Sequence, residues 1–188
     1  MQNRFNKAMD NHGVSKMKKT LIIIGIVAVL GFGVFAYLGG FKDYSITVME
    51  QKSLHLYGLT YRGTPQDEGL KNTFQKIEAA LTDQAEATLH TIYYIEPAGK
   101  LDTMNVFVGL DKVNDDVKVN WEEKVIQGEQ FLMADLRYNK LVMPRPATIK
   151  EDMQDYAEEH RLTLSGIFID RLLREDHVQV WAPISKKK

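Results

Sequence analysis

The longest apolar stretch of the chain has no charged residue from Leu21 to Leu38. At about 1.5 Å of rise per residue, this stretch and its flanks are long enough to cross a hydrocarbon core of roughly 30 Å. A buried helix of a globular domain would show a polar stripe with a period of about 3.6 residues, and none is present here. The pattern therefore predicts a single transmembrane anchor over residues 20–41, preceded by a basic tail over residues 1–19.

The charges beside the apolar stretch predict its orientation. A basic segment, residues 16–19, precedes the stretch, and the positive-inside rule then places the N-terminus in the cytoplasm and residues 42–188 outside it. Signal cleavage and secretion are the alternative, because Val34 and Ala36 are small residues where a signal peptidase reads the chain and Met17 offers a second start. The apolar stretch is longer than the hydrophobic region of a typical signal peptide, which favours a retained anchor in the cell membrane.

Two later segments have apolar residues at the spacing of a helix with one buried face. The first follows Thr64-Pro65-Gln66-Asp67, in which the hydroxyl suits the cap and the proline suits the first helical position. The second begins with Thr148-Ile149-Lys150-Glu151, which matches a capping box. The apolar stripes are Leu70, Phe74, Ile77 and Leu81 in the first helix, and Ile149, Met153, Tyr156, Ala157 and His160 in the second.

Runs rich in β-branched and aromatic residues predict strands around each helix. They are Ser45–Glu50, Leu54–Tyr61, Thr91–Glu96, Met104–Leu110, Trp121–Ile126, Glu129–Tyr138, Gly166–Leu173 and Val178–Ile184. The order is strand, strand, helix, strand, strand, and it occurs twice, with the polar segment Lys112–Asn120 between the two halves. The sequence thus predicts an α+β domain over residues 42–188, built from two duplicated modules whose helices cover one face of the sheet.

Composition and charge exclude several classes of function. The chain contains no cysteine, which excludes disulfides, thiolate metal sites and cysteine nucleophiles. Residues 1–19 carry a net charge of +4 and the rest of the chain −5, so the outer domain has no basic footprint for nucleic acid. The histidines lack metal-ligand spacing and the common catalytic motifs are absent, so we expect no metal, no cofactor and no assigned catalytic residue.

Aromatic and sulfur-containing side chains are dense on the predicted strands. If the helices cover one face of the sheet, alternation leaves such residues on the other face, where they bind a ligand or a partner, or pack the two module sheets together. The predicted set is Tyr57, Tyr61, Phe107, Trp121, Phe131, Met133, Phe168 and Trp181.

Asp170 is the carboxylate that stands out, because it lies within an otherwise apolar strand. An unpaired carboxylate costs several kcal/mol when it is buried, so this one must be paired, hydrated or functional. One interpretation is a salt bridge to Arg137 or Arg174. The other is an anionic contact in a cleft whose aromatic walls add cation–π attraction for a cationic compound. Asp135 and Glu96 are weaker candidates of the same kind.

Three segments give the chain a resemblance to a known family. They are Leu56–Gly63 before the first helix, Met104–Leu110 in the middle and Val178–Ile184 at the end. In their order and spacing, residues 44–184 resemble the GyrI-like small-molecule-binding domains, which also occur as effector-binding domains of bacterial multidrug-responsive transcription activators. The resemblance implies two modules related by a pseudo-twofold axis, with a cleft between them for amphipathic, aromatic or cationic molecules.

The same resemblance bears on catalysis. Some members of the family are similar to hydrolases of cyclopropane-bearing compounds, and members commonly have a Glu in the penultimate strand followed two residues later by Tyr. The matching positions here are Asp170 and Leu172. The shorter acid and the missing hydroxyl favour binding over hydrolysis, because acid–base chemistry needs groups within hydrogen-bond reach of the reacting atom.

Three hypotheses follow. The first is a membrane-anchored, non-enzymatic protein that binds small molecules through the strand aromatics, with Tyr94 among them, and through Asp170. The second is a hydrolase in which Asp170 acts with Tyr57 or Tyr94. The third is a protein-interaction module whose aromatic face binds a partner or a second copy of the chain, which gives a homodimer.

Overall fold

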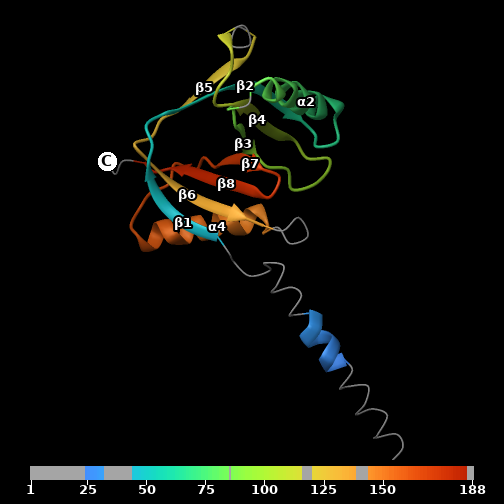
Figure 1. Cartoon of the computed structure of the whole chain (residues 1–188), viewed down its shortest axis with the longest axis vertical. Helices are drawn as coiled ribbons and strands as arrows, with labels where there is room; N and C mark the ends of the chain where they lie inside the picture. Colours follow the sequence, from blue (N-terminus) through green and yellow to red (C-terminus); the bar gives the residue numbers. More distant parts are fainter. Residues whose placement is uncertain (1–23, 32–43, 85, 116–119, 139–143, 186–188) are drawn as a thin grey trace, which may run out of the picture. The chain divides into compact units, whose positions relative to one another are not determined.

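The structure is a computed structural model of the 188-residue chain, and it describes residues 24–31, 44–84, 86–115, 120–138 and 144–185 (Figure 1). The chain divides into two compact units, one of residues 1–42 with 139–143 and one of residues 43–138 with 144–188. In the first unit, the described residues 24–31 are helical. Within the described part of the chain, no helix combines the length and the apolar character needed to cross a membrane. Most of residues 1–41 lie outside the described residues, so the predicted anchor and tail stay predictions.

The second unit is an α+β domain in which every predicted strand and helix is present. Its described elements are β1 (Tyr44–Glu50), β2 (Leu54–Gly63), α2 (Glu68–Thr82), β3 (Leu89–Ile95), β4 (Met104–Leu110), β5 (Glu122–Ile126), β6 (Gln130–Arg137), α4 (Pro146–Glu159), β7 (Ile169–Arg174) and β8 (His177–Pro183). The predicted order of strand, strand, helix, strand, strand, repeated once, is confirmed.

The two helices begin differently from the prediction. Asp67, and not Thr64, caps α2, since its side chain accepts a 2.7 Å hydrogen bond from the Gly69 amide. The predicted capping box at Thr148 is wrong, because α4 begins at Pro146 and has no side-chain cap bond. A proline at the first helical position has its φ already set and loses no intrahelical hydrogen bond. Pro146 therefore starts α4 ahead of Thr148.

One antiparallel sheet of eight strands forms the centre of the domain, in the order β1-β6-β8-β7-β3-β4-β2-β5. The order is symmetric between the modules. The first strands, β1 and β5, form the two edges of the sheet, and the third strands, β3 and β7, meet at its middle. Each module's first strand pairs with the second strand of the other module, β1 with β6 and β5 with β2. Because β3 and β7 join the halves edge to edge, the alternative of two separate sheets packed together is wrong.

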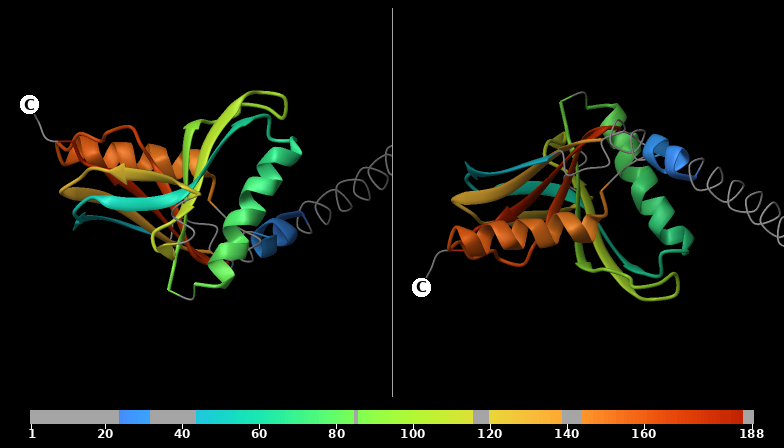
Figure 2. Two further views of the ribbon diagram at one scale, coloured as in Figure 1. Left: turned by 90° about the horizontal axis from the view of Figure 1, so that it is seen from above. Right: turned by 90° about the horizontal axis from the view of Figure 1, so that it is seen from below.

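Both helices lie on the same face of this sheet, which we call the helix face. Directly opposed residues of an antiparallel sheet share a face, and one such row runs through Val108, Thr91, Asp170, Val180 and Ala134. Val108 packs in the core beneath α2, and Val180 and Ala134 pack in the core beneath α4. Figure 2 shows each helix lying along its own half of the sheet.

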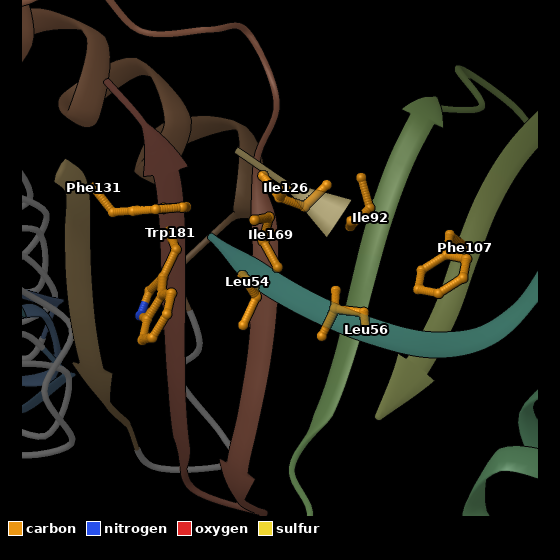
Figure 3. Packing of buried hydrophobic residues seen from close by; sticks show 8 residues of the cluster. All are labelled: Leu54, Leu56, Ile92, Phe107, Ile126, Phe131, Ile169 and Trp181. Carbon is orange, nitrogen blue, oxygen red and sulfur yellow. The ribbon is translucent and has the colours of Figure 1, made fainter. Parts of the chain in front are cut away.

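The other face of the sheet, the open face, carries a third core. Its row runs through Phe107, Ile92, Ile169, Trp181 and Met133. The buried residues of this open-face cluster come from both modules, and they are Leu54, Leu56, Ile92, Phe107, Ile126, Phe131, Ile169 and Trp181 (Figure 3). The open face is therefore partly a packed core that holds the two halves of the domain together.

Candidate functional site

The structure separates the predicted aromatic set between the two faces of the sheet. Four of its members lie on the open face as predicted, namely Phe107, Phe131, Met133 and Trp181. Phe131 and Trp181 are neighbours, with ring centroids 6.0 Å apart. These aromatic rings are buried, so most of their surface packs in the open-face cluster and little of it is left for a ligand.

The other aromatic residues lie elsewhere. The placement of Tyr57, Tyr61, Trp121 and Phe168 on the open face is wrong: Tyr61 and Trp121 pack in the core beneath α2, Phe168 packs in the core beneath α4, and Tyr57 is opposite Leu110 of the helix face. β2 has apolar residues on both of its faces, so alternation alone could not decide which set faces α2.

The tyrosines of the predicted site make local contacts. The Tyr57 hydroxyl donates a 3.2 Å hydrogen bond to Glu123, and the Tyr61 hydroxyl donates a 2.9 Å bond to the Thr64 carbonyl. Tyr94 is exposed, and the Lys124 ammonium lies 6.0 Å from its ring centroid. These contacts fix the turn before α2 and the β2–β5 edge of the sheet.

Asp170 lies on the helix face, at the place where the two halves of the sheet meet. Its register neighbours are Thr91 of β3 and Val180 of β8. The predicted cleft, lined by Asp170 together with Phe107, Phe131 and Trp181, is therefore not formed, because these residues are on opposite faces.

The charge beside Asp170 comes from α4. Burial raises the pKa of the half-buried Asp170 carboxyl, and the Lys150 ammonium opposes this rise. Burial likewise lowers the pKa of Lys150, and Asp170 raises it. The cation whose charge lowers the pKa of Asp170 is thus Lys150, and not the predicted Arg137 or Arg174.

Lys150 is surrounded by the groups that bind a cation. Its ammonium forms an ion pair with Glu96 and lies 5.5 Å from the centroid of the Phe168 ring. Tyr93 lies on the helix face of β3. Burial, together with the charge of Asp170, raises the pKa of its hydroxyl. Two carboxylates and an aromatic face are a set of contacts that stabilises a positive charge away from water.

The remaining acidic candidate has a partner of its own. Oδ1 of Asp135 lies 2.5 Å from Nε2 of His177, on the neighbouring strand β8. Within the described residues, no cluster of three or more His, Asp or Glu side chains is placed to hold a metal ion.

The open face contains a cavity of about 500 Å³. Met133 and Trp181 line it, together with three residues that the sequence did not single out, Arg171, Gln179 and Asp111. Arg171 follows Asp170 in β7, so the carboxylate of Asp170 and the guanidinium of Arg171 lie on opposite faces of the sheet. That alternation was the signal available in the sequence for finding Arg171.

Comparisons with known proteins bear on the fold. No family model matches the sequence, and no curated protein is significantly similar to it. Three solved structures resemble the domain. A hydrolase from Listeria innocua has a TM-score of 0.56 at 8% identity, over 75% of this chain and 92% of that chain. EcmrR in complex with DNA has a TM-score of 0.55 at 9% identity, over 95% of this chain and 72% of that chain.

The C-terminal domain of EcmrR has a TM-score of 0.52 at 14% identity, over 77% of this chain and 99% of that chain. At these identities the likeness concerns the fold alone, and the fold does not decide the activity. The domain has the α+β fold of the GyrI-like effector-binding domains, as the resemblance in its sequence implied.

Proposed function

We propose that this chain is a membrane-anchored protein that binds amphipathic, positively charged small molecules on the helix face of its sheet. The observation that carries the proposal is the position of Lys150, whose ammonium contacts Glu96 and the ring of Phe168 and acts on the Asp170 carboxylate. The protein thus holds its own cation on the helix face of the sheet. A ligand cation would use the same groups.

Exchange between Lys150 and a ligand is physically reasonable. Lys150 reaches this position on a flexible four-carbon side chain, and its partner Glu96 is about half exposed, with 52% of its side chain accessible. The ammonium can therefore swing into solvent together with Glu96 while a ligand takes its place beside Asp170. Phe168 and Tyr93 would then contact the apolar part of the ligand.

The membrane anchor is the part of the proposal that rests on sequence. An uncharged stretch from Leu21 to Leu38 after a basic segment favours a single span with residues 42–188 outside the cytoplasm. Amphipathic cations partition into lipid, so a domain tethered at the membrane would meet them there. Protease added to intact cells should digest the domain and spare an N-terminal tag; protection of the domain would contradict this orientation.

Two neighbouring substitutions should change cation binding in opposite directions. We expect Asp170→Asn to weaken the binding of tetraphenylphosphonium about tenfold, because the anionic contact is lost. We expect Lys150→Met to strengthen it, because a competing cation is removed while the length of the side chain is kept. Calorimetric titration of the full chain measures both, with neutral triphenylphosphine oxide as the probe that should be insensitive to either change.

Lys76→Met is the matched control, since Lys76 is an exposed lysine of α2. This variant removes a positive charge from the domain without touching Asp170, so it should leave binding almost unchanged. Equal binding by Asp170→Asn and the unchanged protein would remove Asp170 from the proposal. Weaker binding by Lys150→Met would show that Lys150 supports the ligand and does not compete with it.

Cation binding should also weaken as the pH is lowered. Burial raises the pKa of Asp170, so this carboxyl loses its charge at a higher pH than an ordinary aspartate does. The dissociation constant for tetraphenylphosphonium should therefore begin to rise at a higher pH than the titration of an ordinary aspartate would allow, whereas that of Asp170→Asn should stay flat. Parallel curves for the two proteins would contradict the assignment.

A hydrolase is the second candidate, because Tyr93 lies near enough to Asp170 for the charge of the carboxylate to raise the pKa of the hydroxyl. General acid–base work by this pair needs a carboxyl and a hydroxyl that can both reach the reacting atom. This candidate replaces the predicted helpers Tyr57 and Tyr94 with Tyr93. It requires turnover of a reactive cyclopropane compound that is lost in both Asp170→Ala and Tyr93→Phe.

A further inference from the structure

Arg171 brings a positive charge to the cavity on the open face. Its guanidinium carbon lies 4.7 Å from the centroid of the Trp181 indole. Its Nη1 lies 3.4 Å from Oε1 of Gln179, and its Nη2 lies 3.5 Å from Oδ2 of Asp111. The side chain is 23% exposed, so the charge is largely withdrawn from water and held in one orientation by the indole.

The hydrogen-bonding capacity of Arg171 is only partly used. A guanidinium has five N–H donors in a planar fork, and the two contacts above are long for hydrogen bonds. Within the described residues, the buried Nε has no hydrogen-bond partner. A group with unfilled donors and a fixed plane is well suited to a carboxylate, which a guanidinium binds through two parallel bonds.

The charge of the cavity favours an anion. Among the described residues that line it, Asp111 is the one carboxylate, whereas Arg171 and Lys112 are both cations. Asp111 already accepts a 2.7 Å hydrogen bond from the Thr88 amide, which fixes it beside the strands. The formal charge of the lining residues is therefore positive. The Lys112 ammonium, however, pairs at 3.0 Å with Glu86, which lies outside the lining, so Arg171 is the cation that matters for a ligand.

Part of the cavity lining is apolar. Met49, Leu54, Met133 and Trp181 form it. Methionine side chains are flexible and polarizable, so such a wall adapts to different ring or chain shapes. A volume of about 500 Å³ is within the usual range for sites that bind small molecules.

We propose that this cavity is a second binding site, which takes an apolar molecule bearing one carboxylate. The carboxylate binds Arg171, and the apolar body packs against Met133, Met49 and the indole of Trp181. The site lies on the other face of the sheet from Asp170 and prefers the opposite charge, so it does not depend on the function proposed above. Aromatic acids and fatty acids share this chemistry.

The two tryptophans of the chain allow the site to be located directly. Trp181 lines the cavity, whereas Trp121 packs against the core beneath α2. In the full chain labelled with 5-fluorotryptophan, 1-naphthoate should shift the ¹⁹F signal of Trp181 and leave that of Trp121 in place. Trp121→Phe assigns the signals. A shift of neither signal, or of Trp121 alone, would overturn the proposal.

Substitution of Arg171 tests the charge preference. We expect Arg171→Gln to weaken naphthoate binding by roughly tenfold or more, and Arg174→Gln, at an exposed arginine of the same strand, to leave it unchanged. Asp170→Asn should also leave it unchanged, which separates this site from the proposed cation site. Equal affinity of Arg171→Gln and the unchanged protein, or equal affinity for neutral 1-naphthalenemethanol, would contradict the proposal.

A second variant keeps the test independent of folding. Gln179→Glu adds a carboxylate next to Arg171 with almost no change in shape, so an internal anion should compete with naphthoate and weaken it about as much as Arg171→Gln does. Undiminished binding would contradict the assignment to Arg171. Decanoate in place of naphthoate identifies the source, since tighter binding of decanoate assigns the site to aliphatic acids and weaker binding assigns it to aromatic ones.

Discussion

Replacing Phe107 with alanine is expected to lower the free energy of unfolding by about 3–5 kcal/mol. Phe107 has no exposed area and belongs to the open-face cluster, in which residues of both modules pack together. The substitution removes a large apolar side chain from that cluster and leaves a cavity, and both effects destabilise the folded state. Because the cluster is shared, the loss should destabilise both modules together.

Urea unfolding of the full chain, followed by far-ultraviolet circular dichroism and by tryptophan fluorescence, measures this effect. The two probes should report one transition that moves to lower urea in Phe107→Ala. Leu101→Ala is the control, since Leu101 is 81% exposed and its truncation should change stability by less than about 0.5 kcal/mol. Two separate transitions, with one of them unmoved, would show that the modules are not held together by this cluster.

The stability of the domain should fall as the pH is lowered from 7 to 4, and His90 is the residue responsible. His90 is fully buried. Burial lowers its pKa from 6.5 to about 4, and the charge of Arg171 acts in the same direction, while Asp111 and the Thr88 carbonyl oppose the change. Between these two pH values the unfolded chain binds a proton at this position and the folded chain does not. Protonation therefore favours unfolding.

The free energy of unfolding should fall by about 3 kcal/mol in total. The fall should begin near pH 6.5 and be complete below pH 4. Chemical unfolding at a series of pH values measures it. In His90→Asn the side-chain amide can still donate a hydrogen bond toward Thr88 but does not titrate, so this variant should lack most of the pH dependence. His160→Asn, at the exposed end of α4, should keep it. The same slope in His90→Asn as in the unchanged protein would contradict the assignment.

The elements of the fold could be predicted because their signals are local. The apolar stripes beginning at Leu70 and Ile149 and the β-branched runs act within a few residues of chain, and the two helices and the strands lie along the segments that these signals predicted, although both helices begin at other residues than predicted. The sheet order could not be predicted in the same way. The pairing of β1 with β6 and of β5 with β2 joins segments far apart in the sequence, and no local pattern specifies such an exchange.

The candidate site shows the same limit at the level of side chains. Asp170 stood out because a carboxylate in an apolar strand needs an explanation wherever the strand lies. Lys150 did not stand out, because its position beside Asp170 depends on how α4 packs against the sheet. Arg171 did not stand out either, although strict alternation along β7 places it on the face opposite Asp170. Face assignments failed for Tyr57 and Tyr61, since β2 is apolar on both sides.

β7 therefore connects the two proposals made for this domain. On the helix face of β7, Asp170 carries a negative charge that the Lys150 ammonium partly compensates. On the open face of β7, Arg171 carries a positive charge beside a partly apolar cavity. Each proposal can fail without the other, because the tests use different probes and different variants.

The most direct test of the central claim is a structure of the full chain with tetraphenylphosphonium bound. We expect the phosphonium on the helix face beside Asp170, with a phenyl ring against Phe168 and the Lys150 ammonium moved away from that ring into solvent. A phosphonium found on the open face beside Trp181, or elsewhere with Lys150 still beside Phe168, would contradict the claim that Asp170 is the anionic contact for a cationic ligand.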